Sequence, residues 1–264
     1  MLSGDNLIFC SRTEYSVEKT QIRLRHLSKP GQIILGFSID VTDRGAVSAM
    51  MEEIISLKLS VNRLVCNAGV IGPIDKFLET DFDKWIDSFN INLFGTLNII
   101  SEVLPNMLRE GTGKIVHVSG GGATSPLPGM TSYAASKIAA VRFIESLAVE
   151  YQDTGVSFNS VAPGMLKTKL LDQMLEAGAA KIGDRLFEKS TEKARDEFDS
   201  TEKAIALIEF LTSAESNGIT GKLISAEWDN WREWPMHLET LQSTDVYTLR
   251  RVTGRDRGAS WGDL

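Results

Sequence analysis

Short apolar runs alternate with longer stretches of helical spacing along most of the chain. A short apolar run that ends at turn residues is typical of a buried strand. By this criterion we predict strands at residues 6–10, 32–38, 63–66, 114–119, 156–161 and 221–226. The run Ile115-Val116-His117-Val118 is apolar on both sides, as expected of a strand covered on both faces.

Between these runs, apolar residues recur at the spacing of one helix face. The predicted helices cover residues 14–30, a stretch that begins after Thr42 or Asp43, one that begins at Thr80 or Asp81, 132–153 and 201–212. Threonine and aspartate at such starts cap backbone N–H groups, and Gly155 is expected to cap the end of helix 132–153.

Strands that alternate with helices in this way indicate parallel βαβ units. We therefore predict an α/β fold of three layers, a doubly wound parallel sheet with helices on both faces. A closed (β/α) barrel is the alternative. The long apolar helix from residue 132 and the break at Pro163-Gly164 favour the open sheet.

Composition and charge narrow the class of protein. The chain has 264 residues, of which 42% are hydrophobic and 24% charged, as in ordinary globular proteins. The net charge of −7 disfavours non-specific nucleic-acid binding. Residues 1–5 lack a signal-peptide pattern, no apolar run has transmembrane length, and Cys10 and Cys66 lie in apolar runs typical of buried thiols. We expect a cytoplasmic protein without metal, membrane or nucleic-acid partners.

Turn and polar residues follow the predicted strands. The carboxyl ends of parallel strands meet at one edge of a sheet, where ligands of such folds bind. The residues expected at this edge are Ser11-Arg12, Asp40-Val41, Asn67-Ala68-Gly69, Ser119-Gly120 and Pro163-Gly164. The pattern therefore predicts a ligand site there.

Tyr133 and Lys137 are the candidate catalytic pair. Four residues apart on a helix, they lie on the same face. A neighbouring ammonium favours the phenolate, so Lys137 is expected to lower the pKa of Tyr133 and make it suitable for general acid–base catalysis. Taken alone, the spacing describes an exposed Tyr–Lys pair equally well.

In combination, the motifs resemble those of the short-chain dehydrogenase/reductase family. The matching motifs are Asp40-Val41-Thr42-Asp43, Asn67-Ala68-Gly69, Asn92, Tyr133-x-x-x-Lys137 and Asn159-x-Val161-x-Pro163-Gly164-x-x-x-Thr168. The resemblance implies an oxidoreductase that interconverts a carbonyl and a secondary alcohol by hydride transfer with a nicotinamide cofactor. It also implies a small-molecule substrate and a homo-oligomer.

The resemblance implies a role for each matched residue. Tyr133 would be the general acid and base, Lys137 would lower its pKa and bind the nicotinamide ribose, and Asn92 would hold a water of a proton relay. Asp40 would bind the adenine edge. The other cofactor-binding residues that it implies are Val41, Asn67, Ala68, Gly69, Pro163, Gly164 and Thr168.

Arg12 bears on the choice of cofactor. An acidic residue at the end of the first strand would bind the ribose hydroxyls of NAD. A guanidinium at this position suits a phosphate instead, which favours NADP(H) over NAD(H). The alternative is that Arg12 is an ordinary solvated loop charge.

The catalytic serine of the family has no direct match. Counting back from Tyr133 places Gly120 at that position, with Ser119 one residue earlier. An offset of one residue turns a strand side chain to the opposite face, so the candidate Ser119 need not inherit the role. Other candidate donors are the N–H groups of Gly120-Gly121-Gly122 and the hydroxyls of Thr124, Ser125 and Ser132.

The glycine-rich turn that binds the pyrophosphate in this family is also absent from the sequence. The strand before that turn would lie between the strands at 6–10 and 63–66, so we expect those two strands to have bare edges. A start assigned too late and a truncated product are the two explanations. A catalytically impaired protein that acts as an interaction module is the alternative function.

The last third of the chain carries no family motif. Residues 166–200 are expected to form a substrate lid on a single domain of residues 1–226, followed by a tail of residues 227–264. The tail is rich in tryptophan and arginine: Trp228, Trp231, Trp234, Trp261, Arg250, Arg251, Arg255 and Arg257. We predict that its indoles pack over the protein's own core, and a subunit interface is the next interpretation.

Overall fold

The computed structural model of the protein describes residues 4–196 and 201–261. Residues 1–3, residues 197–200 of the predicted lid and residues 262–264 of the predicted tail lie outside the described part. In that part, no helix is long and apolar enough to cross a lipid bilayer.

The described chain alternates strands and helices as predicted, with boundaries shifted by a few residues. The strands are β1 (Leu7–Ser11), β2 (Ile34–Ser38), β3 (Arg63–Cys66), β4 (Gly113–Val118), β5 (Val156–Ala162) and β6 (Lys222–Ser225). The helices are α1 (Glu14–Leu27), α2 (Arg44–Ser56), α3 (Phe82–Phe89), α4 (Gly95–Glu110), α5 (Thr131–Glu150), α6 (Lys169–Ala177), α7 (Ala179–Ile182), α8 (Asp184–Arg195), α9 (Thr201–Thr212) and α10 (Leu238–Ser243).

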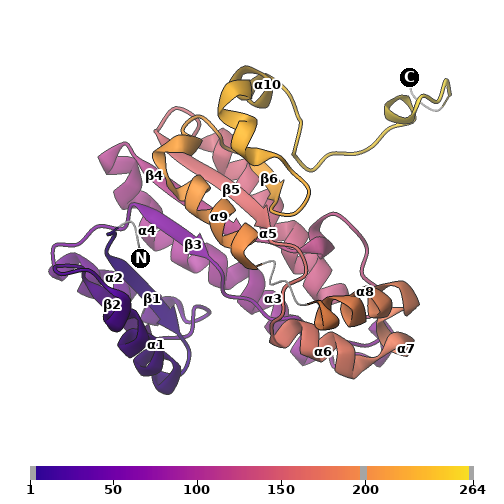
Figure 1. The fold of residues 1–264 in the computed structure, drawn as a ribbon, viewed down its shortest axis with the longest axis horizontal. Helices are drawn as coiled ribbons and strands as arrows, with labels where there is room; N and C mark the ends of the chain where they lie inside the picture. The colour runs from indigo at the N-terminus through magenta and orange to yellow at the C-terminus, as the bar shows by residue number, and fades with distance from the viewer. Residues whose placement is uncertain (1–3, 197–200, 262–264) are drawn as a thin grey trace.

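Helices cover both faces of the parallel strands, which confirms the predicted three-layer α/β fold (Figure 1). On one face, α2, α4 and α5 form a core cluster that includes Ile54, Ile100 and Ile144. On the opposite face, α9 packs on β4, β5 and β6 through Leu207 and Leu211. The apolar faces predicted from helical spacing therefore point to the sheet.

The strands form two separate parallel sheets. One has the order β1-β2, and the other has the order β3-β4-β5-β6. Across the gap, Arg63 Nη1 lies 2.8 Å from Asp5 Oδ2, which joins the starts of β3 and β1. The described residues place no strand between β1 and β3, so the predicted bare edges are confirmed.

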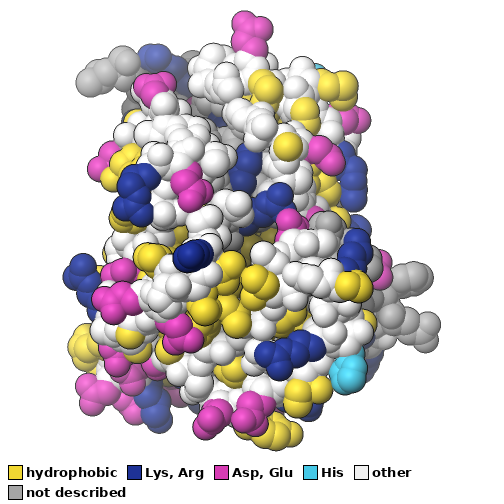
Figure 2. All heavy atoms as spheres, turned by 90° about the vertical axis from the view of Figure 1, so that its left-hand side faces the viewer, with side chains coloured by type: hydrophobic (Ala, Val, Ile, Leu, Met, Phe, Trp, Pro, Cys, Tyr) yellow, Lys and Arg dark blue, Asp and Glu magenta, His cyan; other side chains and the backbone are white. Residues whose placement is uncertain are grey.

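The β1-β2 end of the molecule exposes apolar side chains. Ile33, before β2, is 36% exposed and Val65, in β3, is 39% exposed. Figure 2 shows hydrophobic side chains gathered in a hollow on the face of the molecule that carries this end. Fewer groups cover these strands than cover β5, which is buried along almost its whole length.

Helix starts follow the predicted capping chemistry. Asp43 accepts a hydrogen bond from Ala46 N (3.0 Å) at the start of α2, and Asp81 accepts one from Lys84 N (3.2 Å) at the start of α3. The prediction for Gly155 was wrong, because α5 already ends with Tyr151 as its C-cap. Gly155 forms the turn into β5 at φ 76°, where a Cβ would overlap with Gly111 O.

The segment predicted as a lid forms α6, α7 and α8. These short helices close a small core around Ile71, Met130 and Ile182. In the tail, Trp231 and Trp234 are buried in the cluster of α9, as predicted. Trp228 and Trp261 are 81% and 80% exposed, so the packing prediction was wrong for these two indoles. The boundary at residue 226 stays a prediction.

Candidate active site

The structure brings Gly69, Asn92 and Lys137 together beyond the carboxyl ends of β3 and β4. A Cβ built on Gly69 would lie 3.2 Å from Asn92 Oδ1 and 3.3 Å from Lys137 Nζ. Such distances are too short for most side chains, so glycine lets the backbone pass close to both polar groups. The loop after β3 thus lies against the α5 helix that carries Lys137.

Asn92 anchors this loop. It lies in a π-helical segment, Asn90–Phe94, which interrupts the long helix between α3 and α4. Its buried amide donates to Val70 O and Ser136 Oγ, both at 2.9 Å, and accepts from Val70 N at 2.8 Å. Single π turns inside helices occur often at functional sites, and this one directs Asn92 between β3 and α5.

Lys137 is buried beneath the end of β4. Its Nζ donates to Val118 O at 2.8 Å and lies 5.9 Å from the centroid of the Tyr133 ring. Only 4% of the residue is exposed, and this burial lowers the pKa of Lys137 to about 8. Near neutral pH, this amine can therefore take up or release a proton.

Tyr133 extends across Gly120. A Cβ built on Gly120 would overlap with Tyr133 Oη, so the phenol occupies the space that any other residue at 120 would need. Burial raises the pKa of Tyr133. The expectation that Lys137 lowers this pKa was therefore wrong for this structure, because burial is the dominant effect on the phenol.

Ser119 lies on a different face from Gly120. Gly120 has an extended backbone, φ −176° and ψ 172°, so neighbouring side chains alternate in direction. Ser119 is 3% exposed, and its Oγ has no hydrogen-bond partner among the described residues. Of the other predicted donors, Ser132 Oγ is engaged with Trp85 O at 2.7 Å, and Thr124 and Ser125 are exposed.

His117 is a buried polar residue that the sequence prediction did not select. Its Nδ1 lies 3.2 Å from Ser160 Oγ, and its Nε2 has no partner among the described residues. Burial lowers the pKa of His117 to about 3, so the ring is neutral beside Lys137. The sequence signal that could have identified it is a histidine within the apolar run of residues 115–118.

Asp40 and Arg12 lie at the β1-β2 end of the same edge. Asp40 Oδ1 accepts hydrogen bonds from Thr42 N at 2.9 Å and Thr42 Oγ1 at 2.8 Å. These bonds and the nearby Arg12 charge lower the pKa of Asp40. The Arg12 side chain is exposed and open to an anionic group.

Val41 forms a buried floor beside this pair. Its side chain packs so closely on α4 that a Cβ on Gly95 would lie 2.6 Å from Val41 Cγ2. Its carbonyl oxygen accepts from Asn98 Nδ2 at 3.0 Å. The structure thus fixes Val41, while Asn67 and Ala68 after β3 remain exposed at the edge.

Pro163, Gly164 and Thr168 connect the end of β5 to α6. Gly164 has φ 83°, and a Cβ there would lie 3.1 Å from Glu227 Oε2. Thr168 precedes α6, where its carbonyl oxygen accepts from Leu171 N at 2.9 Å. Glu227 was not selected from the sequence, because its proximity depends on the β5-β6 pairing.

Polar groups lie at two separate ends of this edge. Arg12, Asp40 and Val41 lie at one end of the edge, and Lys137 and the Pro163-Gly164 turn lie at the other. In the described residues, no glycine-rich turn joins these ends between β1 and β3. No group of three or more potential metal ligands occurs in this part of the chain.

The family match agrees with the fold and the site. Residues 1–178 match the family model of the short chain dehydrogenase, and this covers more than half of the chain. The protein therefore belongs to the short-chain dehydrogenase family. It is an oxidoreductase of the kind that acts on CH–OH and C=O groups with NAD(P).

Relatives and solved structures support this assignment. The chain is 29% identical to the 3-oxoacyl-[acyl-carrier-protein] reductase FabG of Thermotoga maritima over 193 residues, which are 72% of this chain and 74% of that protein. An actinorhodin polyketide ketoreductase solved with NADPH shares 26% identity and a TM-score of 0.72, with 83% of this chain and 84% of the other covered. A gluconate 5-dehydrogenase from Burkholderia cenocepacia, at 22% identity, TM-score 0.72 and coverage of 86% and 85%, supports the fold.

Proposed function

We propose that the protein interconverts a small-molecule carbonyl and its secondary alcohol with NADP(H), using Tyr133 as the general acid and base. The observation that carries this proposal is that the buried Asn92 and Lys137 meet at Gly69 beyond the ends of β3 and β4, with the Tyr133 ring 5.9 Å from Lys137 Nζ. When bound, the cofactor supplies or accepts the hydride.

Tyr133 is suited to donate a proton during carbonyl reduction. Because burial raises its pKa, the phenol is protonated near neutral pH. Its Oη lies over Gly120, which has no side chain of its own at this position. In alcohol oxidation the same oxygen would accept the proton.

Lys137 and Asn92 support this proton transfer. The pKa of about 8 places Lys137 near working pH, so its ammonium can stabilise the phenolate left when Tyr133 has given up its proton. The same amine would bind the nicotinamide ribose. Asn92 fixes the loop over Lys137 and is proposed to hold the water through which protons reach the site.

The substrate oxygen needs a further hydrogen-bond donor. Gly121 and Gly122 begin a 3₁₀ turn, and the first N–H groups of such a turn have no partner within it. We assign the oxygen-binding role to these amides, since Ser119 lies on another face. One such donor contributes on the order of 10²-fold or more to turnover.

Arg12 supports NADP(H) as the cofactor. Its exposed guanidinium lies beside Asp40, where a 2′-phosphate would find a matching charge. Asn67, Ala68 and Gly69 would border the adenosine half, and Pro163, Gly164 and Thr168 the nicotinamide half and phosphates. The NADPH in the actinorhodin ketoreductase structure agrees with this choice.

The substrate class to test first is the 3-oxoacyl thioester, because FabG relatives match most of the chain. Residues 166–200 are proposed as the substrate lid, since α6–α8 follow directly on the Pro163-Gly164 turn. The homo-oligomeric state and the cytoplasmic location stay predictions.

Cofactor titration with turnover assays tests the proposal. Purified protein is titrated with NADPH and NADH, and nicotinamide absorbance is followed with 3-oxoacyl thioesters, simple ketones and secondary alcohols. We expect saturable NADPH binding and cofactor consumption with at least one carbonyl. Absence of both would contradict the enzyme assignment and favour an interaction module.

A further inference from the structure

The lid formed by α6, α7 and α8 places apolar side chains against Tyr133. One set of apolar residues, here called the lid cluster, has Ile71, Met130 and Ile182 at its buried centre. Tyr133 packs on this centre, as do the partly buried lid residues Leu170, Met174, Leu186 and Phe187. A molecule that brings its carbonyl oxygen to Tyr133 Oη would therefore lie beside the lid cluster.

The spacing of residues along α6 separates its apolar and charged side chains. Apolar residues of one helix face recur every three or four positions and pack on the cluster: Leu170, Met174 and Ala177. The charged residues of this helix lie on its opposite face and are exposed: Lys169, Asp172 and Glu176. The helix α6 therefore presents an apolar face to the cluster and its charges to solvent.

The hydroxyl groups on the cluster side of α8 are already bonded. Ser190 is buried, and its Oγ donates to Leu186 O at 2.8 Å. Thr191 Oγ1 donates to Phe187 O at 2.9 Å. Such bonds to the carbonyl of the preceding turn use the single hydroxyl hydrogen. Neither hydroxyl therefore has a hydrogen left to donate to a polar substrate.

Polar side chains on the body side of the cluster are bonded in the same way. A Cβ built on Gly72, next to Ile71, would lie 2.5 Å from Ser88 Oγ, so this serine lies close behind the cluster. Its Oγ donates to Trp85 O at 2.9 Å, and Ser132 Oγ donates to the same oxygen at 2.7 Å. These hydroxyls bond the backbone of the protein itself.

An ion pair closes the rim of the lid. In α7, Lys181 Nζ lies 2.7 Å from Asp75 Oδ2 of the segment between β3 and α3. A Cβ built on Gly129 would overlap with Lys181 O, and Gly129 O accepts from Asp75 N at 2.9 Å. The lid thus rests directly on the loops around residues 75 and 129, and the charge of Lys181 is neutralised there.

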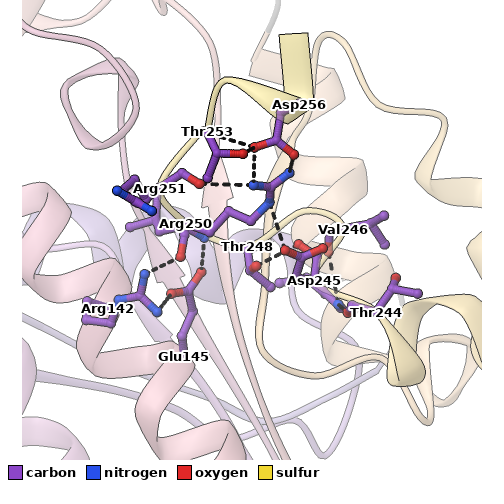
Figure 3. A network of polar contacts seen from close by, with 12 residues as sticks. Arg142, Glu145, Thr244, Asp245, Val246, Thr248, Arg250, Arg251, Thr253 and Asp256 are labelled. Atoms are coloured by element: carbon purple, nitrogen blue, oxygen red, sulfur yellow. Dashed lines mark hydrogen bonds and ion pairs between the residues drawn. The ribbon is translucent and has the colours of Figure 1, made fainter. Parts of the chain in front are cut away.

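Two charged residues of α5, Arg142 and Glu145, are turned to the C-terminal tail (Figure 3). Glu145 Oε1 accepts from Leu249 N at 2.7 Å, and Arg142 Nη1 lies 2.9 Å from Glu145 Oε2. Arg142 is nine positions beyond Tyr133, a rise of roughly 13 Å along the helix. Beside the Tyr133 ring, α5 therefore contributes one charged side chain, that of Lys137.

Such a lining discriminates between substrates by the cost of burying polar groups. A hydroxyl or carboxylate that is buried without a hydrogen-bond partner loses its bonds to water, whereas each buried methylene group favours binding about fourfold. Methionine side chains adapt to different shapes, so Met130 and Met174 suit apolar groups of more than one form. The lid cluster therefore favours alkyl and aryl substituents over sugars and keto acids.

We propose that the substrate is a ketone with an apolar alkyl or aryl group beside its carbonyl, or the matching secondary alcohol, and that Met174 and Phe187 select this group. These are large side chains on two different lid helices, and each is only partly buried, so part of each is open to a ligand. The inference rests on the proposed function, because it takes Tyr133 Oη as the point at which the carbonyl oxygen binds.

Matched ketones test the substrate class. The ratio kcat/KM is measured with NADPH for 2-octanone, for 7-oxooctanoate, which differs only in its terminal carboxylate, and for the shorter 2-butanone. We expect 2-octanone to exceed 7-oxooctanoate on the order of 10²-fold, because the carboxylate would lose its hydration. It should exceed 2-butanone by a similar factor through its four additional methylene groups. Equal values, or a preference for the carboxylate, would overturn the proposal.

Lysine substitutions at neighbouring positions of α6 test the selecting residues. Met174→Lys places an ammonium on the cluster face and Gln173→Lys on the exposed face. We expect Met174→Lys to raise kcat/KM for 7-oxooctanoate relative to 2-octanone by about tenfold or more, and Gln173→Lys to leave this ratio unchanged. Met174→Leu, which keeps an apolar side chain, should also leave it unchanged, and circular dichroism shows whether each variant folds. An unchanged ratio in folded Met174→Lys would show that Met174 does not select the substrate.

Phe187→Ala tests the second lid helix. The change should lower kcat/KM for 2-octanone roughly tenfold and leave that for 2-butanone nearly unchanged, because only the longer chain reaches the phenyl ring. Equal losses for both ketones would remove Phe187 from the selecting residues.

Ligand binding separates this inference from the proposed function. Ligand-observed NMR measures binding of 2-octanone and 7-oxooctanoate to the NADPH-treated protein whether or not turnover occurs. Preferential binding of 2-octanone that is lost in Met174→Lys, without cofactor consumption, would support the lid assignment and contradict the proposed reaction. Cofactor consumption with 7-oxooctanoate as the better substrate would support the reaction and overturn the inference. If neither preferential binding nor consumption is observed, both are wrong.

Discussion

The two sheets of the molecule differ in how completely their residues are paired and covered. In the β3-β4-β5-β6 sheet, β5 has a neighbour on each side and is buried along almost its whole length. In the β1-β2 sheet, every residue of β1 is only partly buried, and neither outer edge has a neighbour among the described strands. The first sheet positions the buried groups that we propose for catalysis, and the second positions the exposed groups that we propose for the cofactor.

The site residues follow the same division. Asn92 and Lys137 are nearly or wholly buried, and each donates to a backbone carbonyl. Arg12 is exposed, and Asp40 is bonded only to its own turn through Thr42. A reaction that moves a proton needs fixed, dry groups, whereas a phosphate can be met by one exposed cation. In the proposed function, the proton-transfer residues and the residues that bind the cofactor phosphate therefore belong to different sheets.

The largest expected difference between the sheets is in hydrogen exchange. Because β1 and β2 have fewer buried contacts, their amides should open more readily than those of β4 and β5. We expect β1 amides to exchange roughly 10³-fold faster than β5 amides in native-state exchange measured by NMR or mass spectrometry. Equal protection in the two sheets would show that they unfold as one unit.

Because Lys137 is buried, the free energy of unfolding should depend on pH. The pKa of Lys137 is about 8 in the folded protein and 10.5 for an exposed lysine, so between these values the unfolded chain holds a proton that the folded chain has released. The free energy of unfolding should therefore rise with pH in this window, by on the order of 3 kcal/mol. Urea unfolding at a series of pH values measures the rise.

Lys137→Met is the control for this measurement. Lys114 and Lys222 also have lowered pKa values through burial, and they titrate in both proteins. The difference between wild type and Lys137→Met therefore isolates the one amine. A difference that does not change with pH would contradict the burial of a titrating Lys137.

Much of the buried sheet could be predicted from local pattern. The strand at 63–66, the Asp43 and Asp81 caps and the facing of Gly120 follow from apolar runs, capping chemistry and strand alternation. These signals lie within a few residues, and each has one physical cause. The family motifs then indicated which ends of the strands carry the site.

Other features depend on contacts that are distant in the sequence. The pKa direction of Tyr133 depends on how deeply α5 is buried, and the nearness of Glu227 to Gly164 depends on strand pairing. The π-helical turn at Asn92 and the exposure of Trp261 have no local signal either. The spacing of residues along a helix or strand shows which side chains share a face of that element. It does not show which other elements pack on that face.

The variant Gly120→Ala tests whether turnover depends on the position of Tyr133 Oη. In Gly120→Ala the new methyl group would overlap with Tyr133 Oη, so the phenol must move. A displacement of this size at a reacting group costs about 10²-fold in turnover. Gly45→Ala in α2 is the control, because it lies outside the proposed site and a Cβ there meets only Asp43 Oδ1, at an ordinary contact distance of 3.4 Å. Steady-state kinetics in which both variants are equally active would remove Tyr133 Oη from this position.

The smallest effect that we expect is on cofactor binding, from replacement of Arg12 after β1. Arg12→Ala should weaken NADPH binding about tenfold, because one charge-assisted contact to a phosphate is lost, and should leave NADH binding unchanged. Fluorescence titration with both cofactors measures this, with Arg25→Ala in α1 as a control for charge alone. If NADPH and NADH weaken alike, Arg12 does not select the cofactor.

The most direct test of the central claim is the replacement Tyr133→Phe, assayed for both turnover and cofactor binding. The change removes only the hydroxyl that lies over Gly120. We predict that kcat falls by roughly 10³-fold, within the range for loss of a general acid, while the dissociation constant for NADPH is unchanged. Turnover close to that of the wild type would contradict the assignment of Tyr133 as the proton donor.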